Sequence, residues 1–162
     1  MAVGSASWSF TEDDFAAITQ ALQRFLDDAN ARCALLVDRS GQLVATVGEQ
    51  PRFDSTAFAT LTAADFSAND QLAKLIGERD FNSLFHQGEK ESMYLADVAR
   101  RLILVVLFDS RTTLGLVRLK MKQTVEELTK LFEQVFARPP QASGGAPGLL
   151  AGADDEIDKL FQ

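Results

Sequence analysis

The sequence predicts one mixed α/β domain of the α+β class, in which three helices alternate with two groups of strands. Three observations predict it. An amphipathic helical pattern near the start is followed directly by a β-hairpin pattern, three extended segments follow one another later, and a long helical pattern comes after them. With 162 residues, 46% of them hydrophobic, the chain is long enough for one domain with its own core.

The first helix is predicted from a start signal and a periodic apolar face. Thr11 and Asp14 have the spacing of a capping box, and the pattern ends near Asn30. The apolar residues recur at intervals of three and four, and they are Phe15, Ile18, Leu22, Phe25 and Ala29. This spacing predicts an amphipathic helix that covers a core.

A hairpin follows the first helix. Residues 33–37 and 43–47 are apolar, and the polar turn Asp38–Gly41 between them has the residues that tight turns favour. Pro51 ends the second strand.

The second helix is predicted to start at Asp54 or Ser55 and to run to Gly77. One of its faces is interpreted as a core stripe of Phe58, Leu61, Ala68, Leu72 and Leu75. A second stripe contains the small residues Thr56, Thr60, Ala63 and Ser67. Small residues let another helix approach closely, or they can pack beneath a loop of the same domain, and the sequence leaves both alternatives open.

Three strands and a final helix complete the domain. Extended segments are predicted at 81–86, 92–99 and 102–108, and their succession indicates antiparallel pairing. Residues 112–136 carry apolar residues at helical spacing. A short part of this window, 117–122, also alternates like a strand, but the whole window favours a helix.

The end of the chain differs in composition from the domain. A stretch rich in Pro, Gly and Ser predicts a flexible linker, and the acidic segment that follows places Ile157, Leu160 and Phe161 on one side of a short helix. We therefore divide the chain into a domain at 1–137, a linker at 138–153 and an acidic amphipathic helix at 154–162. The alternative for this last segment is a frayed acidic terminus.

Charge and hydropathy exclude several classes of protein. A formal net charge of −7 argues against a general nucleic-acid binder. The longest apolar run, Leu102–Phe108, has seven residues, whereas a membrane-spanning helix needs roughly 20. The first residues lack the pattern of a secretory signal, so we expect a cytoplasmic protein. The basic Arg118, Lys120 and Lys122, set against the acidic tail, suit a protein partner.

The sequence offers little for catalysis. It contains one cysteine, Cys33, in an apolar strand, and one histidine, His86, so neither a zinc site nor a nucleophile–base pair is expected. Asp109 is interpreted as a turn or cap residue, with a buried functional carboxylate as the alternative. Three arginines near turns are noted because an arginine can stabilise a phosphoryl-transfer transition state, and they are Arg39, Arg79 and Arg111.

Five segments carry a resemblance to a known family. They are residues 34–43, 72–78, 85–88, 104–109 and 114–119. Together with the order of helices and strands, they resemble bacterial members of the roadblock/longin-type family that regulate Ras-like small GTPases. The resemblance implies a five-stranded antiparallel sheet with helices on both faces, and a C-terminal helix on a linker. One departure is Ala64-Asp65-Phe66, where the family continues with Gly-Asn and small residues.

The resemblance also implies a function. It implies a cytoplasmic homodimer, concentrated at a cell pole, that activates a Ras-like small GTPase in the control of polarity and gliding motility. The dimer would position the catalytic residues of the GTPase, which carries the GTP and magnesium, so no cofactor is expected on this chain and the protein is not itself an enzyme. The C-terminal helix would assist binding or nucleotide exchange. The predicted partner-binding residues are Thr60, Ala63, Ala64, Ser67, Lys120, Lys122, Ile157, Leu160 and Phe161.

Two other functions are weighed against this one. A roadblock scaffold would anchor a polarity or signalling complex without altering GTP hydrolysis. A small-ligand sensor would need polar residues that converge on an internal pocket, and the sequence shows no such set.

Overall fold

The computed structural model describes residues 9–138, so the predicted linker beyond Arg138 and the predicted C-terminal helix lie outside the described residues. The elements follow the predicted order of helix, two strands, helix, three strands and helix. They are α1 (Glu12–Ala29), β1 (Cys33–Asp38), β2 (Leu43–Gly48), α2 (Ser55–Leu75), β3 (Ser83–Gln87), β4 (Ser92–Val98), β5 (Leu102–Phe108) and α3 (Leu114–Ala137).

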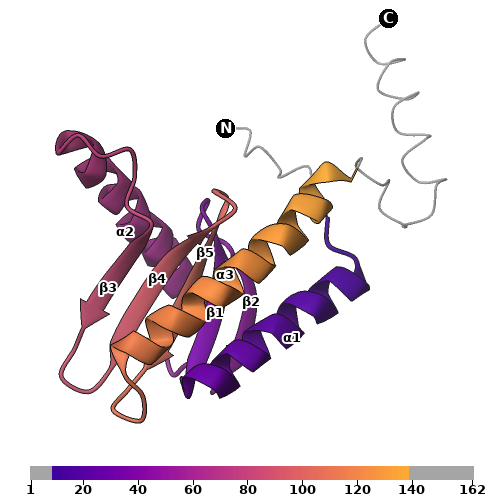
Figure 1. Ribbon diagram of the computed structural model, residues 1–162, viewed down its shortest axis with the longest axis horizontal. Helices are drawn as coiled ribbons and strands as arrows, with labels where there is room; N and C mark the ends of the chain where they lie inside the picture. Colours follow the sequence, from indigo (N-terminus) through magenta and orange to yellow (C-terminus); the bar gives the residue numbers. More distant parts are fainter. Residues whose placement is uncertain (1–8, 139–162) are drawn as a thin grey trace, which may run out of the picture.

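The five strands form one antiparallel sheet in the order β2-β1-β5-β4-β3 (Figure 1). The two most apolar strands, β1 and β5, lie side by side near its centre, with Cys33 opposite Leu107 and Asp38 opposite Leu102. Strands buried on both faces have such continuous apolar runs. The hairpin β1–β2 is joined to the hairpin β4–β5 by the pairing of β1 with β5.

Helices cover both faces of this sheet, as predicted. α1 and α3 pack together on one face, while α2 lies on the other (Figure 1). Successive side chains of β5 alternate between the two cores, so that Leu104 joins the α1–α3 core and Val105 joins the α2 core. The buried phenylalanines Phe25 of α1 and Phe132 of α3 belong to the first core, and Phe66 of α2 belongs to the second.

The predicted helix starts are confirmed in atomic detail. The Thr11 hydroxyl accepts a hydrogen bond from the Asp14 backbone N–H at 3.1 Å, and the Asp14 carboxylate accepts one from the Thr11 N–H at 3.0 Å. Asp54 caps α2 in a similar way by accepting from the N–H groups of Thr56 and Ala57. Each cap satisfies donors that the first helical turn leaves free.

The predicted core stripe of α2 is wrong. Most of its members are exposed, with Leu61 at 69%, Leu72 at 58% and Leu75 at 82% exposure, and Ala68 is also exposed, while Phe58 is half-buried. The residues that face the sheet are instead Ala59, Thr62, Ala63, Phe66, Asn69 and Ala73. α2 has apolar residues on two faces, and periodicity shows that such faces exist without showing which one meets the sheet.

Candidate protein-interaction site

The outward face of α2 carries an exposed apolar stripe. Its members are spaced by three or four residues and are all exposed, and we call them the α2 stripe: Leu61, Ala64, Ala68, Leu72 and Leu75. Ile76, just beyond the helix, is 70% exposed and extends the same surface. A contiguous apolar patch on a water-exposed helix is typical of a protein-interaction site.

The small residues of α2 are divided between this surface and the domain itself. Ala63 is only 9% exposed and lies beneath the β1–β2 turn, where a Cβ added at Gly41 would be 3.9 Å from the Ala63 Cβ and 3.3 Å from the Thr60 Cα. Packing beneath a loop, one of the two open alternatives, therefore holds for Ala63. Thr60 and Ser67 remain exposed.

Arg39 ties the β1–β2 turn to α2 and to β4. Its guanidinium binds Asp70 of α2 at 2.8 Å and also pairs with Asp97 of β4, and it lies over the Phe66 ring, 5.1 Å from its centroid. Partial burial opposes the charged guanidinium, but the hydrogen bonds to Asp97 and Asp70 outweigh it and raise the pKa of Arg39. The turn and the helix thus form one rigid support for the α2 stripe.

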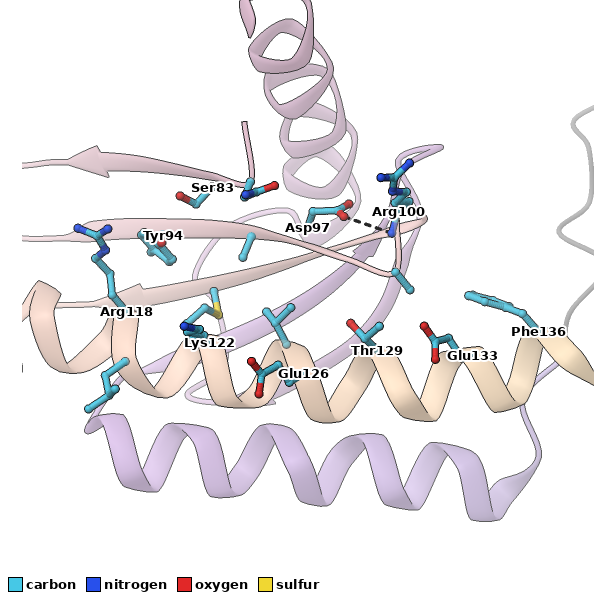
Figure 2. A pocket seen from close by; sticks show the side chains of 16 residues that line it. Ser83, Tyr94, Asp97, Arg100, Arg118, Lys122, Glu126, Thr129, Glu133 and Phe136 are labelled. Carbon is cyan, nitrogen blue, oxygen red and sulfur yellow. Dashed lines mark hydrogen bonds between the residues drawn. The ribbon is translucent and has the colours of Figure 1, made fainter. Parts of the chain in front are cut away.

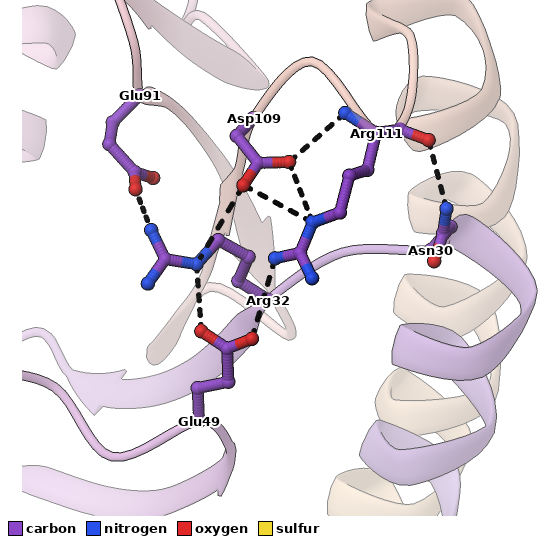
Figure 3. A network of polar contacts seen from close by, with 6 residues as sticks. All are labelled: Asn30, Arg32, Glu49, Glu91, Asp109 and Arg111. Carbon is purple, nitrogen blue, oxygen red and sulfur yellow. Dashed lines mark hydrogen bonds and ion pairs between the residues drawn. The ribbon is translucent and has the colours of Figure 1, made fainter.

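A second polar network joins the other ends of the strands (Figure 3). Arg32 donates to Glu49 at 2.8 Å, and Arg111 donates to the Asp109 carboxylate through its side-chain Nε and its backbone N–H, both at 3.0 Å. The bonds from Arg111 hold the pKa of Asp109 below its usual range, and those from Arg32 lower the pKa of Glu49. The interpretation of Asp109 as a turn residue is confirmed, because its carboxylate is charged and engaged in the turn.

The single cysteine and the single histidine do not form a catalytic pair. Cys33 is buried, and that burial raises the pKa of its thiol to about 11, so the thiolate is scarce at neutral pH. His86 Nε2 instead lies 2.6 Å from Asp65 Oδ2, which links the edge strand β3 to α2. Within residues 9–138, no group of His, Cys, Asp or Glu is arranged to hold a metal ion.

Comparison with known proteins identifies the family. The profile of the Roadblock/LC7 domain matches residues 17–108, more than half of the chain. The chain belongs to the Roadblock/LC7 family. It is 48% identical to MglB of Myxococcus xanthus, with a TM-score of 0.71 over 74% of this chain and 98% of that one.

Two further structures agree with this assignment. A gliding protein of Thermus thermophilus, also named MglB, is 32% identical, with a TM-score of 0.73 over 79% of this chain and 97% of that one. An MglB described as having a tetrameric arrangement is likewise 32% identical, with a TM-score of 0.74 over 80% of this chain and 97% of that one.

The roadblock domain does not bring all the predicted site residues together. Thr60, Ala64 and Ser67 lie on the exposed part of α2, whereas Lys120 and Lys122 lie on α3, across the sheet (Figure 1). Ile157, Leu160 and Phe161 lie outside the described residues. No helix in the described part of the roadblock domain is long and apolar enough to cross a membrane.

Sequence reasoning missed most of the α2 stripe. Leu61, Ala68, Leu72 and Leu75 were assigned to the core, although one signal argued against it. The residues between them, including Ala59, Phe66 and Ala73, supply a second set of apolar positions on the same helix. A helix that is apolar on two sides has one face left for another molecule.

Proposed function

We propose that this roadblock protein is a homodimeric GTPase-activating protein for a Ras-like small GTPase of the MglA type. We place its action in the cytoplasm, concentrated at a cell pole, in the control of polarity and gliding motility. The observation that carries the proposal is the 48% identity to Myxococcus xanthus MglB across 98% of that chain. The resemblance noted in the sequence implies the same function.

The α2 stripe supports the homodimer. Its leucines would be buried if the α2 helices of two copies packed against each other, and burial of apolar surface is the main favourable term in association. In the described part of the chain, β3 pairs with β4 alone, so one edge of the sheet is free to meet the same edge of a second copy. Helix pairing and edge pairing together would give one two-fold platform for a GTPase.

The chemistry of the described residues supports a positioning mechanism. Arg39 and Arg111 both form ion pairs with carboxylates of their own chain. His86 contacts Asp65 and not Cys33. We propose that the dimer holds the arginine and glutamine of the GTPase in their productive arrangement, which accelerates hydrolysis by orientation. The C-terminal helix, through Ile157, Leu160 and Phe161, assists binding or nucleotide exchange.

GTP turnover by the genome-neighbour Ras-like GTPase, measured with and without this protein, tests the proposal. We expect a saturable acceleration of hydrolysis. Ser67→Arg adds a charge to the exposed face of α2 and should weaken this acceleration. Gln20→Arg adds the same charge to α1, on the opposite side of the sheet, and should leave the acceleration unchanged.

The scaffold alternative makes a different prediction. A scaffold would bind the GTPase without changing its rate of hydrolysis. Binding without acceleration at saturating protein would therefore replace the activator by the scaffold, and absence of binding would exclude both.

A further inference from the structure

A groove of about 860 Å³ runs between α3 and the strands β3 and β4, on the side of the sheet away from the α2 stripe (Figure 2). Its apolar floor includes Tyr94, Ala96 and Met121, whose side chains face α3 or the strands and are largely buried. Val125 of α3 adds to this floor. The groove can therefore receive apolar side chains from a segment that lies along α3.

One end of the groove is basic. Arg118 and Lys122 line it there, both are exposed, and neither forms an ion pair with another residue of the described range 9–138. In Figure 2, Arg118 rises from α3 toward the strand that carries Tyr94. Toward the end of α3, the groove is lined by Glu126 and Glu133 and, from the turn that follows β4, by Arg100, so the charges there are mixed. The groove therefore suits a segment that combines acidic residues, placed at the Arg118 end, with apolar ones.

The chain leaves α3 beside this groove. Phe136 lines the groove, and Arg138, the first residue after α3, is held by Asp14 through two contacts of 2.7 Å. Twenty-four residues follow Arg138, and fifteen of them precede Asp154. The segment that follows α3 therefore starts near the Phe136 end of the groove, away from Arg118 and Lys122.

The length of the tether matches the distance to the basic end. A flexible linker of fifteen residues has a root-mean-square span of about 21 Å, and the distance along α3 from Phe136 to Lys122 is also about 21 Å at the rise of an α-helix. The effective concentration of a tethered ligand is greatest when the root-mean-square span of its linker equals the distance to the binding site.

We propose that this groove is the docking site for the chain's own C-terminal segment, residues 154–162. The segment has the required composition: Asp154, Asp155, Glu156 and Asp158 would pair with Arg118 and Lys122, and Ile157, Leu160 and Phe161 would cover the apolar floor. The docking does not depend on the proposed GTPase. Where the proposed function holds, the groove and the GTPase compete for the same tail.

A spin label on the tail of the full-length protein tests the docking without any GTPase. The label is attached at Gln162→Cys, and Cys33 can stay in place because its thiol is buried. We expect the label to broaden the backbone amide NMR signals of Ser83, Tyr94 and Lys122 strongly, and those of Thr60 on α2 weakly. Equal broadening on both sides of the sheet would overturn the proposal.

Charge reversal supplies the matched control. Arg118→Glu with Lys122→Glu should reduce the ratio of docked to free tail by roughly fivefold, the scale of two exposed ion pairs. Lys90→Glu with Lys130→Glu makes the same change in net charge outside the groove and should leave the ratio unchanged. An equal effect of the two double variants would contradict the assignment of Arg118 and Lys122.

A mixed sample separates docking within one chain from docking between copies. Spin-labelled protein without ¹⁵N is mixed with ¹⁵N protein that carries no label. We expect little broadening in the groove of the ¹⁵N protein, since each tail would occupy its own groove. Broadening as strong as in the singly labelled chain would overturn docking in cis and assign the groove to the tail of a second copy.

Discussion

Two residues of the β1–β2 turn determine how that turn meets α2. Gly41 has φ +98° and approaches Thr60 closely, so a side chain there would be strained and crowded. Arg39 then holds the turn in place through carboxylates on two other elements, Asp70 and Asp97. The position of α2, and with it the orientation of the α2 stripe, depends on these contacts.

Arg39→Met should destabilise the fold. It would leave Asp70 and Asp97, both largely shielded from water, without their shared cation, and we expect a loss of about 1–2 kcal/mol, discounted for the partial exposure of the site. Urea unfolding at pH 7 measures this loss of unfolding free energy. Arg24→Met is the control, because the Arg24–Glu127 pair is largely exposed and its loss should cost less than about 0.5 kcal/mol. Equal losses would show that the Arg39 network adds nothing to stability.

Arg79 is the turn arginine that tests the positioning mechanism. Unlike Arg39 and Arg111, it forms no ion pair within residues 9–138. We expect Arg79→Ala to change the maximal rate of stimulated GTP hydrolysis by less than about tenfold, since removal of an arginine finger costs about 1,000-fold or more. Single-turnover hydrolysis at saturating protein measures the rate, and a loss on the larger scale would replace positioning by direct catalysis.

At the scale of elements, the two helices α1 and α3 are joined at their ends as well as along their lengths. The Asp14 carboxylate caps α1 and also binds Arg138 just beyond α3. The hydrogen bond from Arg138 is the main cause that lowers the pKa of Asp14 to about 2. The contact sets the point from which the rest of the chain departs.

This contact predicts a dependence of stability on pH. The pKa of Asp14 is 3.8 without its partners and about 2 in the fold, so the stabilisation is complete above pH 3.8 and is lost as the pH falls toward 2. Arg138→Gln should therefore lower the unfolding temperature at pH 7, and the difference from the wild type should shrink near pH 2.

Thermal unfolding of Arg138→Gln and of the wild type at pH 7, 4 and 2.5 measures this difference in stability. Arg52→Gln is the control, because Arg52 is exposed and forms no ion pair in the described part of the chain. A difference for Arg138→Gln that stayed constant over this pH range would show that the ion pair with Asp14 does not contribute.

At the scale of the whole molecule, the two sides of the sheet present different surfaces. One side carries the α2 stripe, and the other carries the groove along α3 (Figures 1 and 2). α2 packs on the sheet through Phe66 and several smaller residues, while its leucines face outward. Such a surface is costly in a monomer and favours self-association.

Leu72→Asp should convert the proposed homodimer to a monomer at micromolar concentration, because it would place a charge in the proposed α2 contact. Sedimentation velocity measures the mass. Leu119→Asp is a closely matched control, since Leu119 is a leucine of similar exposure, 56% against 58%, on α3 across the sheet. A wild-type protein that is already a monomer, or a variant that stays dimeric, would remove the α2 stripe from the interface.

Much of the fold was predictable from residues close together in the chain. The caps at Thr11 and Asp54, the turn at Asp38–Gly41 and the strand Leu102–Phe108 all agree with the structure. Among the predicted site residues, Lys120 and Lys122 lie across the sheet from α2, and Ala63 lies beneath the turn. Its burial depends on Gly41, which is far from it in the sequence, and no local pattern reports that contact.

The sequence by itself determined the order of the elements and their approximate limits, because these depend on composition and on neighbours within a few residues. Only the tertiary structure decided which side of α2 meets the sheet, which arginines are engaged, and that α2 and Lys122 lie on opposite sides. The physical reason is that exposure depends on what packs against a side chain, and in this domain the packing partners come from distant parts of the chain.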